Sequence, residues 1–264
     1  IDSDVITVVH LTEVFRQAAQ SLIVTNAHAI VSGELPDLSV RDNDFFFLQK
    51  SSPEAAVSTV VDLCARRLPA SYGYSPTRDI QVISPTRIGS SGTAELCRRL
   101  QEVLNPQDGS KTEYKFGPNL FREGDKVMQI RNNYDKEVFN GDIGMIDAVD
   151  VAARNLKVNF DGRIVEYDVT ELDELTLAYA TTIHKAQGSE YPIVVMPVLM
   201  NHFVMLQRNL IYTGITRAKK ILVMVGTRKA LACAVRNVTV NRRNTLLKER
   251  LQQSVDRIET KEGE

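Results

Sequence analysis

The sequence is poor in the features that mark secreted, metal-binding and membrane proteins. Its three cysteines, Cys64, Cys97 and Cys233, are far apart and lack metal-ligand spacing, so we expect buried thiols in a reducing compartment, without disulfides or a metal site. The longest apolar run, Ile193 to Met200, is too short to span a bilayer, and no signal peptide opens the chain. These absences predict a cytoplasmic protein with no membrane partner.

The net charge gives no reason to expect a polyanionic partner. Lys and Arg total 32 against 33 Asp and Glu, so any nucleic-acid contact must be local. With 264 residues and 43% hydrophobic content, the chain can bury one large core, or a core and a small satellite domain. It opens at Ile1 directly in apolar periodic sequence, and we expect it to be part of a longer polypeptide.

Strands and helices are predicted to alternate up to Asn105. Two short helices are expected in LTEVFRQAAQSLIVTNAHAIVSG, with Thr12 and Thr25 as N-caps and Gly33 as the stop. Strands are predicted at DFFFLQ and DIQVISPT, and helices at SSPEAAVSTVVDLCARRLP, ending at Pro69, and at TAELCRRLQEVLNP. This alternation is typical of a parallel sheet.

Short strands without helices follow Asn105. KVMQIRNN, DIGMIDAV, LKVNF and RIVEYDV come in quick succession, with tight turns at Asn140–Gly141 and Asp161–Gly162, and a small antiparallel β barrel fits this run. TLAYATTI, PIVVMPV and KKILVMVGT then return as apolar strands of the parallel kind. We predict an α/β parallel-sheet domain in two parts, residues 1–116 and 174–264, with the barrel inserted at residues 117–173.

The segment TTIHKAQGSEY, Thr181 to Tyr191, is a polar loop between two buried strands. Ligands of open α/β sheets gather at the carboxyl ends of the strands, and we expect this segment to lie there. Its hydroxyls and imidazole can bond phosphate or sugar, Gly188 permits close backbone approach, and Glu190 can accept from a ribose hydroxyl. The alternative is a polar surface turn, because short motifs match often by chance.

A second segment, NLIYTGITRAKKILVMVG, places Thr213, Thr216 and Arg217 on an expected helix that leads into a buried strand. The arginine is therefore close to the sheet. For this segment taken alone, we favour a solvated or salt-bridged arginine over a catalytic one.

Together, TIHKAQGSEY and YTGITRAKK resemble motifs V and VI of superfamily 1 helicases, and VFRQ near the start resembles motif IV. REGDKVMQIRNNYDKEVFNGDIGMI is similar to the SH3-like insertion in the second motor domain of RecD/TraA-type DNA helicases, and SPTRIGSSGTAELCRRLQ to the segment before it. The resemblance implies that this chain begins just after motif III. It also implies that the chain is a RecA-like second motor domain with an SH3-like barrel.

The resemblance also implies roles for single residues. Arg16 and Arg217 would reach the γ-phosphate of ATP across an interdomain cleft, where guanidinium groups stabilise phosphoryl transfer, with Arg217 as the arginine finger. Gln17, Gly188 and Glu190 would contact the nucleotide.

A further set would contact single-stranded DNA. Thr182 and His184 would face the strand, with a histidine that shapes the loop by hydrogen bonding as the alternative for His184. Ser84, Thr86 and Arg87 suit phosphate binding, with a helix-capping turn as the alternative. For the Asn140 turn we favour a simple hairpin over DNA contact.

Nothing in the sequence has the form GxxxxGK[ST], and no acidic strand end holds magnesium. ATP and Mg²⁺ would therefore be cofactors of the full-length helicase. Its missing N-terminal motor domain would be a partner of this chain. The chain alone is expected to be inactive. Movement from 5′ to 3′ on DNA and possible repair or recombination partners rest on the resemblance alone. The alternatives are a non-catalytic nucleic-acid-binding or scaffolding module, disfavoured by Arg16, Glu190 and Arg217, and a UvrD-type repair helicase, disfavoured by the short β insertion.

Overall fold

The computed structural model describes residues 5–9, 21–40, 43–238 and 246–262. Arg16, Gln17 and Thr12 lie outside these residues, so the expectations for them stay predictions. The chain divides into two compact units, residues 19–238 and residues 1–18 with 239–264.

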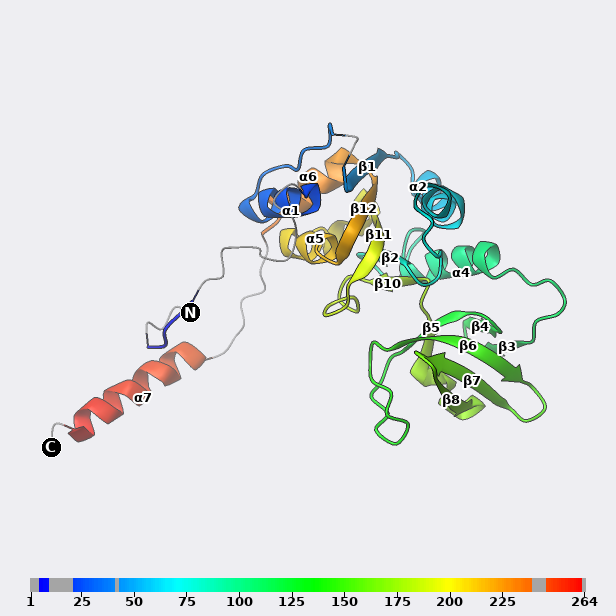
Figure 1. Cartoon of the computed structure of the whole chain (residues 1–264). Helices are drawn as coiled ribbons and strands as arrows, with labels where there is room; N and C mark the ends of the chain where they lie inside the picture. Colours follow the sequence, from blue (N-terminus) through cyan, green and yellow to red (C-terminus); the bar gives the residue numbers. More distant parts are fainter. Residues whose placement is uncertain (1–4, 10–20, 41–42, 239–245, 263–264) are drawn as a thin grey trace. The chain divides into compact units, whose positions relative to one another are not determined.

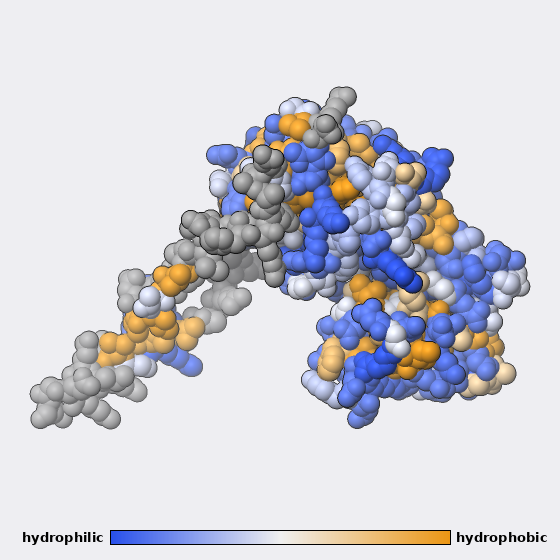
Figure 2. Space-filling model, in the orientation of Figure 1, coloured by the Kyte–Doolittle hydropathy of each residue, from blue (hydrophilic) through white to orange (hydrophobic). Residues whose placement is uncertain are grey.

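Helix α7 (Leu247–Glu262) belongs to the second unit. Figure 2 shows apolar surface along it, and Leu246 and Leu247 are both exposed. In the described part of the chain, no helix combines the length and the apolar character that crossing a membrane requires.

A five-stranded parallel sheet forms the centre of the larger unit, with strand order β1-β12-β11-β2-β10 (Figure 1). Residues on β11 alternate between two hydrophobic clusters: Ile193 and Val195 pack with α2 and α4, whereas Val194 and Met196 pack with α1, α5 and α6. Helices therefore cover both faces, which confirms the RecA-like α/β fold. The elements are α1 (Leu22–Ser32), β1 (Phe45–Gln49), α2 (Pro53–Asp62), α3 (Leu68–Tyr72), β2 (Ile80–Ser84), α4 (Thr93–Leu104), β10 (Ala180–Thr182), β11 (Tyr191–Val198), α5 (Arg208–Ile215), β12 (Ala218–Gly226) and α6 (Arg228–Arg236).

Two predicted helix ends are wrong. Ser21, not Thr25, caps α1, because its hydroxyl accepts from the Val24 N–H while Thr25 lies inside the helix. The helix after β1 does not end at Pro69 but continues to Tyr72 through a π-helical turn at Leu63–Arg67. In that turn the Leu68 N–H bonds to the Leu63 carbonyl, five residues back, and this wider pairing accommodates Pro69, which has no N–H of its own. Gly33, with φ of 89°, ends α1 as predicted.

The predicted antiparallel barrel is present. Its five-stranded sheet has the order β8-β7-β6-β5-β9, and β3 and β4 pair beside it. Asp161 and Gly162, with φ of 50° and 94°, form the predicted turn between β7 and β8. A Cβ at Gly144 would lie 2.6 Å from Val158, so the close packing of β6 against β7 favours glycine there. The strands are β3 (Glu113–Phe116), β4 (Asn119–Arg122), β5 (Lys126–Gln129), β6 (Ile143–Asp150), β7 (Asn155–Phe160), β8 (Arg163–Asp168) and β9 (Leu175–Leu177).

TLAYATTI is not one parallel strand. Leu175–Leu177 pairs antiparallel with β5 of the barrel, and only Ala180–Thr182 pairs with β2. The chain thus passes from the barrel to the parallel sheet within a few residues. The boundaries at 117 and 173 remain predictions.

A buried carboxylate joins the barrel to the α/β domain. Asp125 is fully buried, and its two oxygens accept four hydrogen bonds, from Gln101 (2.5 Å), Asn105 (2.7 Å), the Arg122 N–H (2.8 Å) and the Tyr179 hydroxyl (2.9 Å). Burial raises the pKa of Asp125, and these donors oppose that rise. One hydrophobic cluster also runs from α2 and α4 into the barrel.

The next residue makes a second buried connection. Lys126 is 3% exposed, and its ammonium donates to Gln81 Oε1 on β2 at 2.8 Å. Gln81 in turn donates to the carbonyls of Ala178 and Tyr179. Burial lowers the pKa of Lys126 to about 8, because a charged ammonium loses hydration there.

Asp125→Ala is expected to lower the free energy of unfolding by about 3 kcal/mol, because it leaves several buried donors without an acceptor. Asp125→Asn should cost less. Denaturant titration measures both, with the exposed Asp135→Ala as the control. A loss for Asp125→Ala no larger than that of the control would contradict the buried connection.

The lowered pKa of Lys126 predicts that the free energy of unfolding rises with pH. Between the folded pKa of about 8 and the unfolded value of about 10.4, the unfolded state binds more protons, so the folded state gains as pH rises. The wild-type free energy of unfolding should therefore increase, relative to Lys126→Met, by about 2 kcal/mol between pH ~7.5 and ~9.5. Denaturant titrations of both proteins at the two pH values test this, and a constant difference would refute it.

Candidate functional site

The candidate residues gather at two opposite ends of the parallel sheet. At the carboxyl end, Thr182 on β10 is in register with Ser84 on β2. At the amino end, Tyr191 on β11 is in register with Ala218 on β12. The loop from Ile183 to Glu190 runs from one end to the other, so the prediction that the whole segment lies at the carboxyl ends is wrong for its second half.

The turn after β2 caps helix α4 with its backbone. The carbonyls of Thr86 and Arg87 accept from the N–H groups of Thr93 and Ala94, the first residues of α4. A Cβ at Gly92 would lie 2.5 Å from the Arg87 carbonyl oxygen, so only glycine permits this packing. The helix-capping alternative therefore describes the backbone of this turn.

The side chains of the turn differ in what they can reach. Ser84 is fully buried, and its hydroxyl donates to the Ser91 carbonyl at 3.0 Å, so Ser84 shapes the turn rather than contacting a strand. Ser91 also bonds His202 Nε2 at 2.7 Å, and burial lowers the pKa of His202 to about 4. Thr86 is half-buried, and the Arg87 side chain is exposed.

Arg87 and Lys185 form a pair of cations at the carboxyl end. Both side chains line the same small cavity, and partial burial and then repulsion from Arg87 lower the pKa of Lys185. Across the described residues, neither side chain pairs with a carboxylate. Two close, unpaired cations favour an anion between them.

A small cavity of about 60 Å³ lies beside this pair. Thr181, 4% exposed, has a hydroxyl there without a hydrogen-bond partner, and Thr182 contributes a second hydroxyl. The barrel supplies an apolar wall, which includes Met128 and Ile130. The cations and hydroxyls at this cavity suit contact with a phosphate of a nucleic-acid backbone.

Sequence reasoning missed Lys185 and chose its neighbour His184. The His184 side chain is exposed, does not line the cavity and makes no hydrogen bond within the described ranges, so the structure does not give it the loop-shaping role. The only sequence signal for Lys185 is its place in the same motif. Gly188, with φ of 86°, provides the left-handed turn that brings the loop to β11.

At the amino end, three neutral oxygens hold the guanidinium of Arg217. It donates to the carbonyls of Thr213 (3.1 Å) and Ser189 (3.0 Å) and to the Thr216 hydroxyl (3.2 Å). Helix α5 ends at Ile215, so Arg217 lies after the helix rather than on it. No carboxylate of the described chain pairs with Arg217, which argues against the salt-bridged alternative. A half-buried, positioned cation of this kind is suited to a phosphate.

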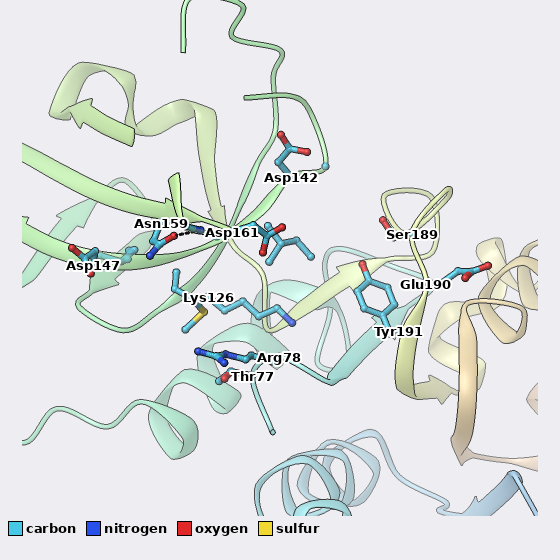
Figure 3. Close-up of a pocket in the computed structure, with 16 residues that line it drawn as sticks. Thr77, Arg78, Lys126, Asp142, Asp147, Asn159, Asp161, Ser189, Glu190 and Tyr191 are labelled. Carbon is cyan, nitrogen blue, oxygen red and sulfur yellow. Dashed lines mark hydrogen bonds between the residues drawn. The ribbon is translucent and has the colours of Figure 1, made fainter. Parts of the chain in front are cut away.

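Glu190 lies beside this arginine and pairs with Lys219 at 3.1 Å. In Figure 3 its carboxylate and the Tyr191 ring extend to opposite sides of the strand, as neighbours on a strand do. Tyr191 lines a cavity of about 710 Å³ between the barrel and the sheet, together with Arg78 and Lys126. The Tyr191 N–H donates to the Arg217 carbonyl, and the Arg217 guanidinium donates to the Ser189 carbonyl. Both hydrogen bonds hold the end of the loop against Arg217.

Two family models match the chain. Residues 96–160 match the SH3 domain of ATP-dependent RecD-like DNA helicases, and residues 177–225 match the UvrD-like helicase C-terminal domain. The first covers α4 and much of the barrel, and the second covers the candidate loop and Arg217.

Similar proteins and structures agree with these matches. The chain is 35% identical over 243 residues to the ATP-dependent RecD2 DNA helicase of Deinococcus radiodurans, covering 92% of this chain and 32% of that protein. It is 36% identical over 125 residues to the RecBCD enzyme subunit RecD of Haemophilus influenzae, covering 47% of this chain and 18% of that protein. The chain thus spans about a third or less of these relatives.

Among solved structures, the Pif1 helicase from Bacteroides in complex with ADP-AlF3 and single-stranded DNA shares the fold, with a TM-score of 0.52 at 15% identity over 94% of this chain and 57% of that one. A structure of two coordinating Pif1 helicases at forked DNA gives the same TM-score of 0.52 at 16% identity, over 94% of this chain and 55% of that one. With its parallel α/β sheet, its barrel and these two matches, the chain has the SH3 domain of RecD-like DNA helicases followed by a UvrD-like helicase C-terminal domain.

Proposed function

We propose that this chain supplies the second motor domain of an ATP-dependent DNA helicase that moves along single-stranded DNA. The observation that carries the proposal is the single loop, Ile183 to Glu190, that begins beside two unpaired cations and ends beside Arg217. It connects a site suited to a nucleic-acid phosphate with a site suited to a nucleotide phosphate. The names of the relatives support ATP and DNA as the two ligands.

At the carboxyl end, Arg87 and Lys185 would bind a strand phosphate, with Thr182 and the unpartnered Thr181 hydroxyl as donors beside them. Such contacts are mainly to the backbone, so they hold the strand without reading its sequence. His184 and Thr86 would border this site, and Ser84 would keep its turn in shape. The polarity of movement and any repair or recombination partner rest on family likeness.

At the amino end, Arg217 would face the terminal phosphate of ATP, which supplies the phosphoryl group whose transfer to water drives the motor. Its donors already point along fixed directions, because three neutral oxygens hold the guanidinium. A cation without a carboxylate partner keeps its full charge for the phosphate. Gly188 and Glu190 would border the nucleotide, and the first motor domain of the longer protein would supply the phosphate loop and the Mg²⁺ ligands.

The second candidate is a non-catalytic nucleic-acid-binding module. Such a module would have no role for Arg217, which is held in position at the end of the sheet opposite Arg87 and Lys185. The 264-residue chain by itself is expected to show no ATP turnover on either proposal. The complete enzyme therefore distinguishes them.

Arg87→Ala and Lys185→Ala should each weaken binding of single-stranded DNA about tenfold and lower the slope of log affinity against log salt by about 0.7 per lost phosphate contact. Fluorescence anisotropy of the chain with a labelled oligonucleotide measures both. Lys229→Ala, which removes an exposed lysine of α6, is the matched control. An unchanged salt slope in both variants would refute the phosphate contact.

In the complete enzyme, Arg217→Ala should lower ATP turnover at least about a hundredfold, because an arginine finger contributes about a thousandfold or more to phosphoryl transfer. Affinity for single-stranded DNA should stay nearly unchanged, and Arg217→Lys should restore little, because an ammonium lacks the planar fork. Steady-state ATPase and thermal melting are measured on the same preparations, with the exposed Arg228→Ala as control. Near-normal turnover in a well-folded Arg217→Ala enzyme would exclude the assignment.

A further inference from the structure

The hairpin between β5 and β6 carries two exposed aromatic rings side by side. Tyr134 is 74% exposed and Phe139 is 44% exposed. Their ring centroids are 5.9 Å apart at an interplanar angle of 75°. Exposed rings held together on a projecting hairpin form an apolar surface that the barrel core does not use.

The barrel holds this hairpin in one conformation. Asn133 and Val138 form a bridge, and the Val138 side chain is fully buried in the core. Lys136 lies between the rings in sequence but turns back to the barrel, where its ammonium donates to the Glu166 carbonyl (2.8 Å) and lies 4.5 Å from the centre of the Tyr167 ring. The rings are thus presented on a fixed support, which lowers the entropy cost of binding.

Most charges around the two rings are already engaged. Arg131 pairs with Asp173 at 2.7 Å, Lys136 with Glu171 at 2.5 Å, and Glu137 with Arg163 at 3.0 Å. No cation of the hairpin is therefore left to hold a phosphate. What the hairpin offers a ligand is the faces of its rings.

The base of the hairpin adjoins the cation pair. Met128 and Ile130 line the small cavity beside Arg87 and Lys185. Gln129, between them, bonds through its backbone to Gly141 and Asp142, at the other side of the hairpin base. Tyr134 is four residues beyond Ile130, so it lies at most about 14 Å from it. A strand held by the cations therefore lies within reach of the two rings.

We propose that Tyr134 and Phe139 form a stacking surface for unpaired bases of the DNA strand that Arg87 and Lys185 hold by its phosphates. This inference rests on the proposed function and adds a base-contacting part to it. Aromatic rings stack on any base, so the surface grips single strands without sequence preference. The Asn140 turn supports the two rings and does not contact the strand, because the Asn140 N–H donates to Asn132 Oδ1 within the hairpin.

A comparison of a normal oligonucleotide with an abasic one of equal length tests the proposal in the 264-residue chain. The wild type should bind the normal strand more tightly, by about tenfold for each stacked base. The double variant Tyr134→Ala/Phe139→Ala should bind both strands with equal affinity, and its salt slope should match that of the wild type, since it loses no phosphate contact. Tyr134→Phe should keep the preference.

Tyr72→Ala/Phe203→Ala is the matched control, because it removes two exposed rings, 46% and 60% exposed, from other elements. Retained preference for the normal strand in the Tyr134→Ala/Phe139→Ala variant would overturn the stacking surface. So would a wild type that binds both strands equally, or a wild-type dimer in sedimentation that this variant abolishes. Failure of the wild type to bind either strand would instead refute the proposed function.

Discussion

Parallel pairing sets where each part of this site can lie. In a parallel sheet every connection must return the chain from the carboxyl end of one strand to the amino end of the next. The β10–β11 connection does so in a single loop, from Ile183 to Glu190, without a helix of its own. Ile183 and Ala186 are fully buried and anchor the loop to the sheet. This loop therefore contacts both ends of the sheet, which a surface turn could not do.

The barrel depends on the same sheet. Asp125 and Lys126 are neighbours at the start of β5, and they bond to different parts of the α/β domain, Asp125 to α4 and Tyr179, Lys126 to Gln81. Through Gln81 the barrel contacts β2, whose carboxyl end leads to Arg87. Buried side chains thus connect the barrel wall with the strand that leads to the exposed Arg87, and the exposed hairpin extends from the barrel.

Local pattern was sufficient for much of this fold. Apolar runs located β2, β11 and β12, and the Asp161–Gly162 pair located a hairpin turn, because both signals depend on neighbouring residues alone. Features set by distant contacts were missed. The division of TLAYATTI between two sheets depends on pairing with β5 and β2, and the continuation past Pro69 depends on a π-helical turn. Arg217 and Thr182 were selected from their motifs, and their roles stay predictions. Lys185 was recognised only from its place beside Arg87 in the cavity lining, and the sequence did not show that Ser84 is buried and bonded to Ser91.

In the proposed function, one loop links the strand site to Arg217. Hydrogen exchange of residues 183–191 in the chain, with and without saturating oligothymidylate, tests this link directly. We expect slower exchange along the whole loop, including the Ser189 N–H, which bonds to the Ala186 carbonyl, and the Tyr191 N–H, which bonds to the Arg217 carbonyl. Slowing confined to the residues next to Lys185, with no change at Ser189 and Tyr191, would contradict it.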